Sequence, residues 1–342
     1  MRAFFIESIG EIRANSKPLK LREVEIPKIR NSEILIKVHA CGVCHTEIDE
    51  IEGRATPAFL PIIPGHQITG EVVEVGKLVT KFKIGDRVGA GWIYSACGKC
   101  EYCLKGFENL CENFKATGKD VHGGYAEYFR IDENFAFLLP ENFTYDETAP
   151  LFCAGAIGYR ALSLAKPEQG YNIALVGFGA SAYLVLKMII NLFPNSKVFV
   201  FSRTESERAF SIKLGAFWAG NFDEEPPEKL DIAIDTTPVW SPPLSVMKYL
   251  KPAGRLIINA IRKENKDKIS LLNIDYANDL WLEKEIKTVT NITRKDISEF
   301  LNIASKFSIR PEVEKYAFLD ASRVLFDIKE RKIKGAKVIV FD

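Results

Sequence analysis

The chain of 342 residues lacks a charge excess of either sign, because 46 lysines and arginines stand against 45 aspartates and glutamates. This balance gives no support to nucleic-acid binding, which usually draws on a basic surface. The sequence also lacks any window that approaches the roughly 20 apolar residues of a membrane span. Its opening apolar stretch is interrupted at Glu7, Gly10 and Glu11, too early for a signal peptide. We therefore expect a cytoplasmic protein that binds neither nucleic acid nor membrane.

Internal repeats and low-complexity segments are also missing. Hydrophobic residues make up 47% and charged residues 27% of the chain, as is usual for a soluble globular protein. A chain of this length exceeds one ordinary hydrophobic core and suggests about two domains.

Seven cysteines occur without a secretion signal, which favours metal binding or catalytic thiols over disulfides. Four of them follow the spacing C-x2-C-x2-C-x7-C, at Cys97, Cys100, Cys103 and Cys111. Four thiolates so close in sequence can enclose a tetrahedral zinc ion with no open position, as in structural sites. Four unrelated free thiols in a polar loop would instead be an oxidation liability. We expect a structural zinc lobe at about residues 95–113.

A second candidate metal site joins two separated segments, 42–47 and 64–67. Cys44, Thr46 and His66 bring a thiol, a hydroxyl and an imidazole towards one point, across an expected polar loop. Thiolate and imidazole are ligands that zinc prefers, and a catalytic zinc site keeps one position open. Taken alone, one cysteine and one histidine more often indicate a buried thiol and a packed histidine. The assignment therefore depends on the rest of the chain.

Two regions of the sequence differ in their pattern of secondary structure. Residues 1 to about 90 contain short apolar runs divided by turns and no sustained helical period, which predicts a mainly β, barrel-like domain. From Gly170 onward, strands alternate with helices, which predicts a parallel, doubly wound sheet. A helix at 296–306 and strands at 316–318 and 338–341 are expected to return to the first domain.

The motif Gly177-x-Gly179-x-x-Ala182 directly follows a buried strand at 172–176 and opens a helix. The first glycine permits a tight turn, the second lets the backbone approach a pyrophosphate, and the small third residue allows close helix–sheet packing. The pyrophosphate would then meet the free N–H groups of the helix N-terminus. The alternative is a glycine-rich turn without a nucleotide.

The second strand of this region ends in Ser202 and Arg203, where an NAD site would normally offer Asp or Glu to the ribose 2′-hydroxyl. These two side chains could instead hold a 2′-phosphate, with the guanidinium as a fork-like donor. Alternatively, Arg203 stacks on adenine or faces solvent. The motif favours NADP(H) over NAD(H).

Taken together, these segments resemble the zinc-dependent medium-chain alcohol dehydrogenases, in order and across essentially the whole chain. The resemblance implies an α/β fold in two domains. One is a GroES-like, β-rich catalytic domain at residues 1–154 and 293–342, and the other is a Rossmann domain at residues 155–292, with an active-site cleft between them. It also implies two zinc ions per chain.

By resemblance, the catalytic zinc ligands are Cys44, His66 and Cys153. The structural zinc takes the four cysteines of the lobe, so Cys41 is left as a bystander, although its use as an adjacent ligand stays open. Glu47 stands where a carboxylate usually orients a zinc-bound ligand.

The resemblance also assigns the proton relay and shows two departures from the family. Thr46 matches the hydroxyl that takes the substrate proton, and His45 is placed to approach the cofactor pyrophosphate or else to face solvent. Gln67 replaces the glutamate usual after the ligand histidine. Asp49 stands where several members carry the histidine that ends the relay, so the proton could leave through Asp49, water or a cofactor hydroxyl.

These assignments imply an alcohol dehydrogenase or aldehyde reductase that transfers hydride between an alcohol and NADP(H) or NAD(H). Trp92 and Ile93 are expected to line the substrate pocket, although packing between two lobes is their ordinary role. Small alcohols or aldehydes are the expected partners, and the chain is expected to form a homodimer or homotetramer. One alternative is a zinc-independent quinone or enone reductase on the same scaffold, and another is a non-catalytic nucleotide-binding relative.

Overall fold

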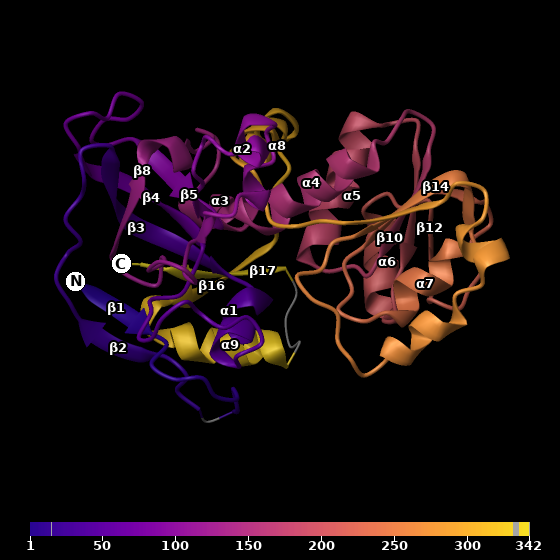
Figure 1. Cartoon of the computed structure of the whole chain (residues 1–342), viewed down its shortest axis with the longest axis horizontal. Helices are drawn as coiled ribbons and strands as arrows, with labels where there is room; N and C mark the ends of the chain where they lie inside the picture. Colours follow the sequence, from indigo (N-terminus) through magenta and orange to yellow (C-terminus); the bar gives the residue numbers. More distant parts are fainter. Residues whose placement is uncertain (15, 331–334, 342) are drawn as a thin grey trace. The chain divides into compact units, whose positions relative to one another are not determined.

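The computed structural model describes residues 1–14, 16–330 and 335–341, and the chain divides into two compact units. Unit 1 comprises Met1–Cys153 and Ile292–Asp342, and unit 2 comprises Ala154–Asn291. In Figure 1, unit 1 contains the indigo and purple strands together with the yellow C-terminal segment, and unit 2 runs from pink to orange.

Unit 1 is built around a seven-stranded sheet of order β16-β17-β3-β4-β5-β9, in which β8 also pairs with β3. Two small antiparallel pairs, β1-β2 and β6-β7, complete its strands. The bounds are β1 Arg2–Phe5, β2 Lys20–Glu23, β3 Glu33–Val43, β4 Gln67–Val75, β5 Arg87–Ala90, β6 Ile93–Ser95, β7 Lys115–Ala116, β8 Tyr128–Asp132, β9 Phe137–Leu138, β16 Val313–Ala317 and β17 Ala336–Val340. The long β3 carries buried residues on both faces, so it forms the centre of this unit.

The helices of unit 1 are short, apart from α8. Their bounds are α1 His45–Ile51, α2 Glu101–Leu104, α3 Tyr145–Thr148, α8 Arg294–Phe307 and α9 Ala321–Lys329, with the 3-10 turns η1 Glu108–Leu110, η2 Glu133–Phe135, η3 Ala149–Phe152 and η6 Phe318–Asp320. The helix α1 corrects our expectation of a polar loop after Thr46 and of no helix before residue 90. It packs against α9, which the sequence analysis did not identify (Figure 1).

Unit 2 contains a six-stranded, parallel sheet of order β12-β11-β10-β13-β14-β15, which confirms the predicted doubly wound arrangement. Its elements are α4 Ala154–Ala165, β10 Asn172–Val176, α5 Ala180–Leu192, β11 Lys197–Phe201, α6 Glu205–Lys213, β12 Trp218–Gly220, β13 Leu230–Asp235, α7 Ser241–Met247, β14 Leu250–Ile258, η4 Lys268–Asn273, the π-helical turn η5 Tyr276–Leu280 and β15 Glu285–Thr288. The strand order reverses between β10 and β13, and this switch point opens the ligand-binding crevice of such sheets.

The core of unit 2 follows the period of two that strands impose. Alternate residues of β10 and β11, such as Ala174, Val176 and Phe201, form one buried cluster with Val246 and Met247 of α7. The intervening residues of the same strands are buried as well. Strands buried on both faces are typical of parallel sheets covered by helices.

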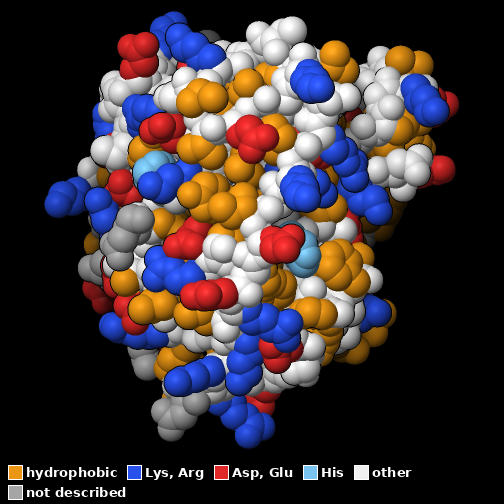
Figure 2. All heavy atoms as spheres, turned by 90° about the vertical axis from the view of Figure 1, so that its left-hand side faces the viewer, with side chains coloured by type: hydrophobic (Ala, Val, Ile, Leu, Met, Phe, Trp, Pro, Cys, Tyr) orange, Lys and Arg blue, Asp and Glu red, His pale blue; other side chains and the backbone are white. Residues whose placement is uncertain are grey.

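The described residues contain no helix that is long and apolar enough to cross a membrane. On the face of the molecule in Figure 2, basic and acidic side chains are interspersed with apolar ones, rather than gathered by sign. This mixture agrees with a formal net charge of +1.

Candidate functional site

Cys44, His66 and Cys153 come together in unit 1, although they lie far apart in the sequence. Cys44 joins β3 to α1, His66 directly precedes β4, and Cys153 follows η3. Their ligand atoms all lie within 4.8 Å of one another, and the Cys44 Sγ is 3.6 Å from the His66 Nε2. Two sulfurs and one imidazole nitrogen at such distances fit the donor set of a catalytic zinc ion.

The carboxylate of Glu47 lies behind the ligand histidine. Its Oε1 is 2.7 Å from the His66 Nδ1, and its Oε2 accepts a hydrogen bond of 2.9 Å from the Cys44 backbone N–H. Burial lowers the pKa of His66, but the charges of Glu47 and Cys44 raise it well above its usual range. A carboxylate on the far nitrogen leaves the Nε2 to face the two thiols, as metal-binding histidines require.

The thiol of Cys44 is difficult to ionise without a cation beside it. The contact with the Cys153 thiol, burial and the Glu47 carboxylate together raise the pKa of Cys44 well above its usual range. Metal binding replaces thiol protons, so a divalent cation would relieve this accumulation of negative charge. The residues present therefore fit a metal ion at this position.

The four cysteines predicted for the structural site also lie within 4.8 Å of one another. The backbone N–H groups of Lys99 and Cys100 lower the pKa of Cys97 to about 6. Burial and the neighbouring thiols raise the pKa of Cys103 to about 12. Opposite pKa shifts are expected when one thiol of a close group ionises before its neighbours. A cation would neutralise four thiolates at this spacing, so the cluster fits a closed zinc site.

The zinc lobe is attached to the rest of unit 1 through Glu108. Its carboxylate accepts hydrogen bonds from the Arg294 backbone N–H at 2.6 Å and from the Arg294 Nε at 2.8 Å. Arg294 begins α8, so the lobe is joined to the segment that returns from unit 2.

The glycine turn of unit 2 has the shape that a dinucleotide requires. Gly177 has a φ of +84°, and a Cβ there would lie 2.9 Å from the Thr237 Cγ2. A Cβ at Gly179 would meet no atom of the described chain within 4 Å, so the missing side chain leaves space for a ligand beside the backbone. Gly179 caps α5 without any side-chain hydrogen bond, and Ala182 is buried. The free N–H groups of this helix start fit a pyrophosphate.

The two residues predicted to select the cofactor differ in their surroundings. Ser202 is 1% exposed, and its hydroxyl donates a hydrogen bond to the Glu207 carboxylate. Arg203 is exposed, and its backbone carbonyl accepts a hydrogen bond from Arg208. The Ser202 hydroxyl is therefore already engaged, and a phosphate contact at this position depends on the arginine.

The other predicted residues of the catalytic segment lie on α1 or beside it. Thr46 is half-buried, and its backbone N–H donates to the Cys44 Sγ at 3.3 Å. His45 is exposed in unit 1, so its predicted contact with a pyrophosphate in unit 2 stays a prediction. Asp49 is buried and forms an ion pair of 2.6 Å with Arg54. Its predicted relay role also stays a prediction, in competition with this ion pair.

Gln67 begins β4, opposite Gly42 of β3. A Cβ at Gly42 would lie 2.6 Å from the Gln67 Oε1, so the glycine makes room for the amide. The Gln67 Nε2 is buried without a hydrogen-bond partner among the described residues. The glutamine therefore brings a neutral and only partly satisfied group next to the ligand histidine.

The two predicted pocket residues have different environments. The Trp92 ring packs edge-on against His66, with 4.8 Å between ring centroids, so it borders the candidate zinc site. Ile93 is fully buried in β6, where it pairs with Ala116. This placement favours a packing role for Ile93 within unit 1, and its predicted place on a pocket wall stays a prediction.

Glu50 and Tyr125 are buried close to the group formed by Cys44, His66 and Cys153, and no sequence pattern pointed to them. Both are fully buried, and neither the Glu50 carboxylate nor the Tyr125 hydroxyl has a hydrogen-bond partner in the described part of the chain. Burial and then the Glu47 charge raise the pKa of each well above its usual range. Glu50 lies three residues after Glu47, so a predicted helix at α1 would have placed both on one face.

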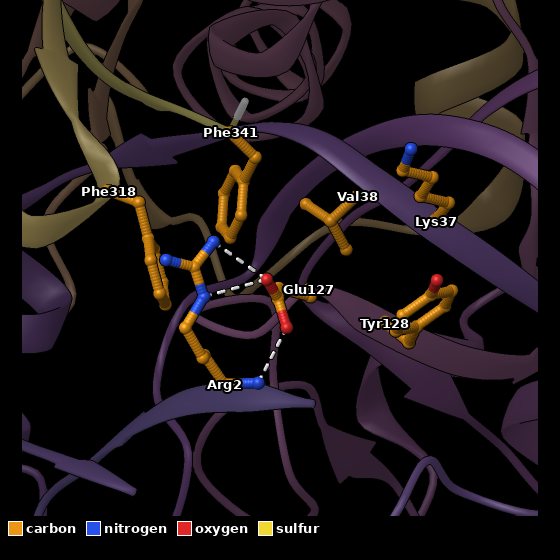
Figure 3. A pocket seen from close by; sticks show the side chains of 7 residues that line it. All are labelled: Arg2, Lys37, Val38, Glu127, Tyr128, Phe318 and Phe341. Carbon is orange, nitrogen blue, oxygen red and sulfur yellow. Dashed lines mark hydrogen bonds and ion pairs between the residues drawn. The ribbon is translucent and has the colours of Figure 1, made fainter. Parts of the chain in front are cut away.

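A pocket of about 240 Å³ lies elsewhere in unit 1, and no predicted site residue lines it (Figure 3). Arg2 donates hydrogen bonds to the Glu127 carboxylate from its backbone N–H at 2.6 Å and its Nε at 2.8 Å. Its guanidinium also lies over the Phe318 ring. Glu127 thus neutralises this arginine, and Lys37 adds a further positive charge to the lining.

Comparison with known proteins agrees with this geometry. Residues 30–141 match the family model described as "Alcohol dehydrogenase GroES-like domain". A "Probable alcohol dehydrogenase AdhA" from Mycobacterium tuberculosis is 36% identical over 94% of this chain and 93% of its own length. An "Alcohol dehydrogenase" from Geobacillus stearothermophilus is 34% identical over 94% of this chain and 96% of its own length. The NADP(H) complex of CAD from Helicobacter pylori superposes with a TM-score of 0.84 at 25% identity, covering 99% of each chain.

The chain therefore belongs to the zinc-type medium-chain dehydrogenase/reductase family. Its two units are the GroES-like and Rossmann-like parts of that fold. Its relatives are named alcohol dehydrogenases, and the chain is an oxidoreductase.

Proposed function

We propose that this chain interconverts an alcohol and its aldehyde or ketone, with zinc and a nicotinamide cofactor. The observation that carries the proposal is the cluster of Cys44, His66 and Cys153 with Glu47 behind the histidine. A zinc-independent quinone or enone reductase would not need these three ligands together. A relative without catalysis would not need to keep these three ligands in the same chain as a glycine turn shaped for a nucleotide.

A zinc ion held by these three side chains would supply a Lewis acid that favours the ionised alcohol and polarises the carbonyl. Thr46 is the residue that moves the proton. Its hydroxyl oxygen accepts the alcohol proton while its own proton passes outward to water or to a neighbouring group. The glycine turn at Gly177 and Gly179 would hold the pyrophosphate of a nicotinamide cofactor, and that cofactor would supply the hydride acceptor for the alcohol carbon.

NADP(H) is the cofactor that we propose over NAD(H). No acid directly follows β11 in the sequence, although the Glu207 carboxylate reaches the Ser202 hydroxyl. The exposed Arg203 can form a charge-assisted pair with a 2′-phosphate. The Ser202 hydroxyl contributes less than expected, because it donates to Glu207. The Helicobacter pylori protein that superposes on this chain binds NADP(H), which supports the same choice.

The test measures initial rates with primary, secondary and aromatic alcohols, each with NADP⁺ and NAD⁺, alongside the zinc content. We expect two zinc ions per chain and turnover that depends on the cofactor. Thr46→Ala should slow turnover by roughly 10²–10⁴-fold with both zinc ions retained, because a positioned proton acceptor contributes that much. Thr46→Ser keeps the hydroxyl and should stay near wild type. Turnover of an enone but of no alcohol would instead favour the reductase alternative.

The cofactor assignment has its own variant. Arg203→Ala should raise the Michaelis constant for NADP⁺ by about one to two decades, since a charge-assisted hydrogen bond contributes roughly 1.5–3 kcal/mol. The constant for NAD⁺ should stay nearly unchanged. Equal losses would mean that Arg203 contacts the adenine, and a wild-type preference for NAD⁺ would refute the assignment.

We also propose that the chain forms a homodimer or a homotetramer. The strand β15 lies at one edge of the sheet of unit 2, and all four of its residues are exposed. An exposed edge strand is a ready site for pairing with another chain. Light scattering of the purified protein would give the mass of the assembly, and a monomer would contradict the proposal.

A further inference from the structure

The segment that starts at the last residue of β13, residues 235–239, is held in one conformation by hydrogen bonds. We call it the crevice loop. The Asp235 Oδ1 accepts hydrogen bonds from the Thr237 backbone N–H at 3.0 Å and from its hydroxyl at 2.7 Å. The backbone N–H of Thr236 donates to the Val176 carbonyl of β10 at 2.9 Å. The loop thus folds back on the carboxyl ends of β13 and β10.

A buried lysine from the chain after β14 completes this arrangement. The Lys263 ammonium donates to the Asp235 Oδ2 at 2.5 Å, to the Thr237 carbonyl at 2.8 Å and to the Val239 carbonyl at 2.7 Å. The side chains of Lys263 and Asp235 are 6% and 0% exposed. These three acceptors match the three donors of an ammonium group, so one side chain fixes both ends of the crevice loop.

The crevice loop borders the place where a dinucleotide binds. Val176 and Asp235 are paired neighbours at the ends of β10 and β13, on the two sides of the switch point. A Cβ on Gly177 would lie 2.9 Å from the Thr237 Cγ2 and 3.0 Å from the Thr236 Oγ1, so the loop touches the glycine turn. Ligands of such sheets bind in the crevice at this switch point.

We propose that Lys263 is a positioning residue for the nicotinamide half of the cofactor, acting through the crevice loop. This inference rests on the proposed function, because it requires a nicotinamide cofactor. The strands β10, β11 and β12 form one mononucleotide half, in which Ser202 and Arg203 directly follow β11, where the adenosine ribose is expected. The crevice loop and Lys263 follow β13 and β14, in the other half. They therefore face the part of the crevice left for the nicotinamide nucleotide.

A buried ion pair is a poor device for stability alone, since apolar residues of similar volume often stabilise as well or better. Its value here lies in geometry, because the ammonium is the donor that pins two backbone carbonyls of the crevice loop. The chain contains a matched pair for comparison. Lys251 and Asp231 form an ion pair of 2.8 Å at the opposite, amino ends of β14 and β13, away from the switch point.

The test compares Lys263→Met, Lys251→Met and the double variant Asp235→Leu/Lys263→Met with the wild type. Fluorescence titration gives the dissociation constants of NADPH and NADH, competition gives that of ADP, and calorimetry gives Tm. Lys263→Met should raise both cofactor constants about tenfold or more, because binding must then order the crevice loop. The ADP constant should stay within about twofold, as should every constant for the partly exposed Lys251→Met control.

The double variant separates positioning from stability. It removes both charges, so its Tm should return towards the wild-type value, while its NADPH and NADH constants should stay raised. The proposal is overturned if Lys263→Met weakens ADP and the whole cofactor equally, or if the double variant recovers cofactor affinity along with Tm. A wild-type protein that binds neither NADPH nor NADH would overturn the proposed function itself. That failure appears in the wild-type titration alone, before any variant is compared.

Discussion

The two cysteine clusters of unit 1 are assembled in opposite ways. The zinc lobe takes its four thiols from the short segment Cys97–Cys111, with only α2 and η1 between them. The other cluster takes Cys44, His66 and Cys153 from three segments that the seven-stranded sheet brings together. The lobe can therefore form its site from local structure, whereas the second cluster exists only when the sheet, α1 and η3 are in place. A substitution in the lobe and a substitution in the second cluster should therefore be detected by different measurements.

The largest expected effect follows from Cys44→Ser. Turnover should fall to background and one zinc ion per chain should be lost, because an open metal site needs all three ligands. Tm should change little, since the sheet that assembles the cluster stays intact. Zinc analysis and steady-state rates would check this, with Cys41→Ala as the control: Cys41 is buried nearby but lies outside the cluster. An active Cys44→Ser enzyme would remove the residue from the site.

Cys103→Ser should have the next largest effect, on the four-cysteine lobe. It opens the site proposed for the structural zinc, where a bound metal would contribute folding free energy directly. One zinc ion should therefore be lost, with a decrease in Tm of roughly 5–10 °C, or about 2–3 kcal/mol. The rate per folded molecule should stay close to wild type at low temperature. Calorimetry and zinc analysis would measure this, and an unchanged Tm after loss of the zinc would mean that the lobe does not stabilise unit 1.

Glu47→Gln should have a smaller effect, confined to the second cluster. The amide keeps the shape of the side chain but removes the charge that lies 2.7 Å from the His66 Nδ1. Groups that orient a metal ligand typically contribute 10–100-fold in metal affinity or activity, and we expect a loss in that range. Competition with a chromophoric chelator would measure the zinc affinity. Equal zinc affinity in the variant and the wild type would mean that the carboxylate serves only to accept the hydrogen bond from the Cys44 backbone N–H.

The smallest effect concerns the far end of α1. Burial alone would raise the pKa of Glu52, but hydrogen bonds from Lys329, Ile12 and Arg54 lower it from 4.5 to about 2. The charged form is therefore favoured in the folded state, and this stability is present above about pH 4.5 and is lost as the pH falls towards 2.

Glu52→Gln should accordingly lower Tm at pH 6, and the difference from wild type should shrink as the pH approaches 2.5. Melting curves at several pH values would show this, with Glu7→Gln, which breaks a more exposed ion pair with Arg22, as the control. A difference in Tm that is independent of pH would mean that the carboxylate charge is not the cause.

The sequence predicts most of the fold, and the residues explain where it does not. The parallel sheet of unit 2 was predictable because β10 and β11 are apolar after their first residue and β13 keeps an apolar centre between Asp231 and Asp235, as is typical of buried parallel strands. The helix α1 was missed because its capping box uses Cys44, whereas the usual signature begins with Ser or Thr.

The candidate site likewise contains residues that the sequence predicts and contacts that it does not. The cysteines of the lobe were predictable because their spacing is local. The burial of Ser202 against Glu207, the ion pair of Asp49 with Arg54 and the tether at Lys263 all depend on side chains that meet only in the folded chain. A single sequence carries no periodic or spacing signal for such contacts.

The pairing of β17 with β3 has a consequence for how the protein is made. Val338 and Lys337 of β17 lie beside Gly42 and Val43, the residues that lead into Cys44. During synthesis, β3 leaves the ribosome long before its neighbour, with the whole of Ala154–Asn291 translated in between. Unit 2 is continuous and can fold as soon as it is complete, because domains generally fold as units in the order of their synthesis. We therefore expect nascent chains that stop before residue 336 to bind nucleotide without assembling the Cys44, His66 and Cys153 cluster.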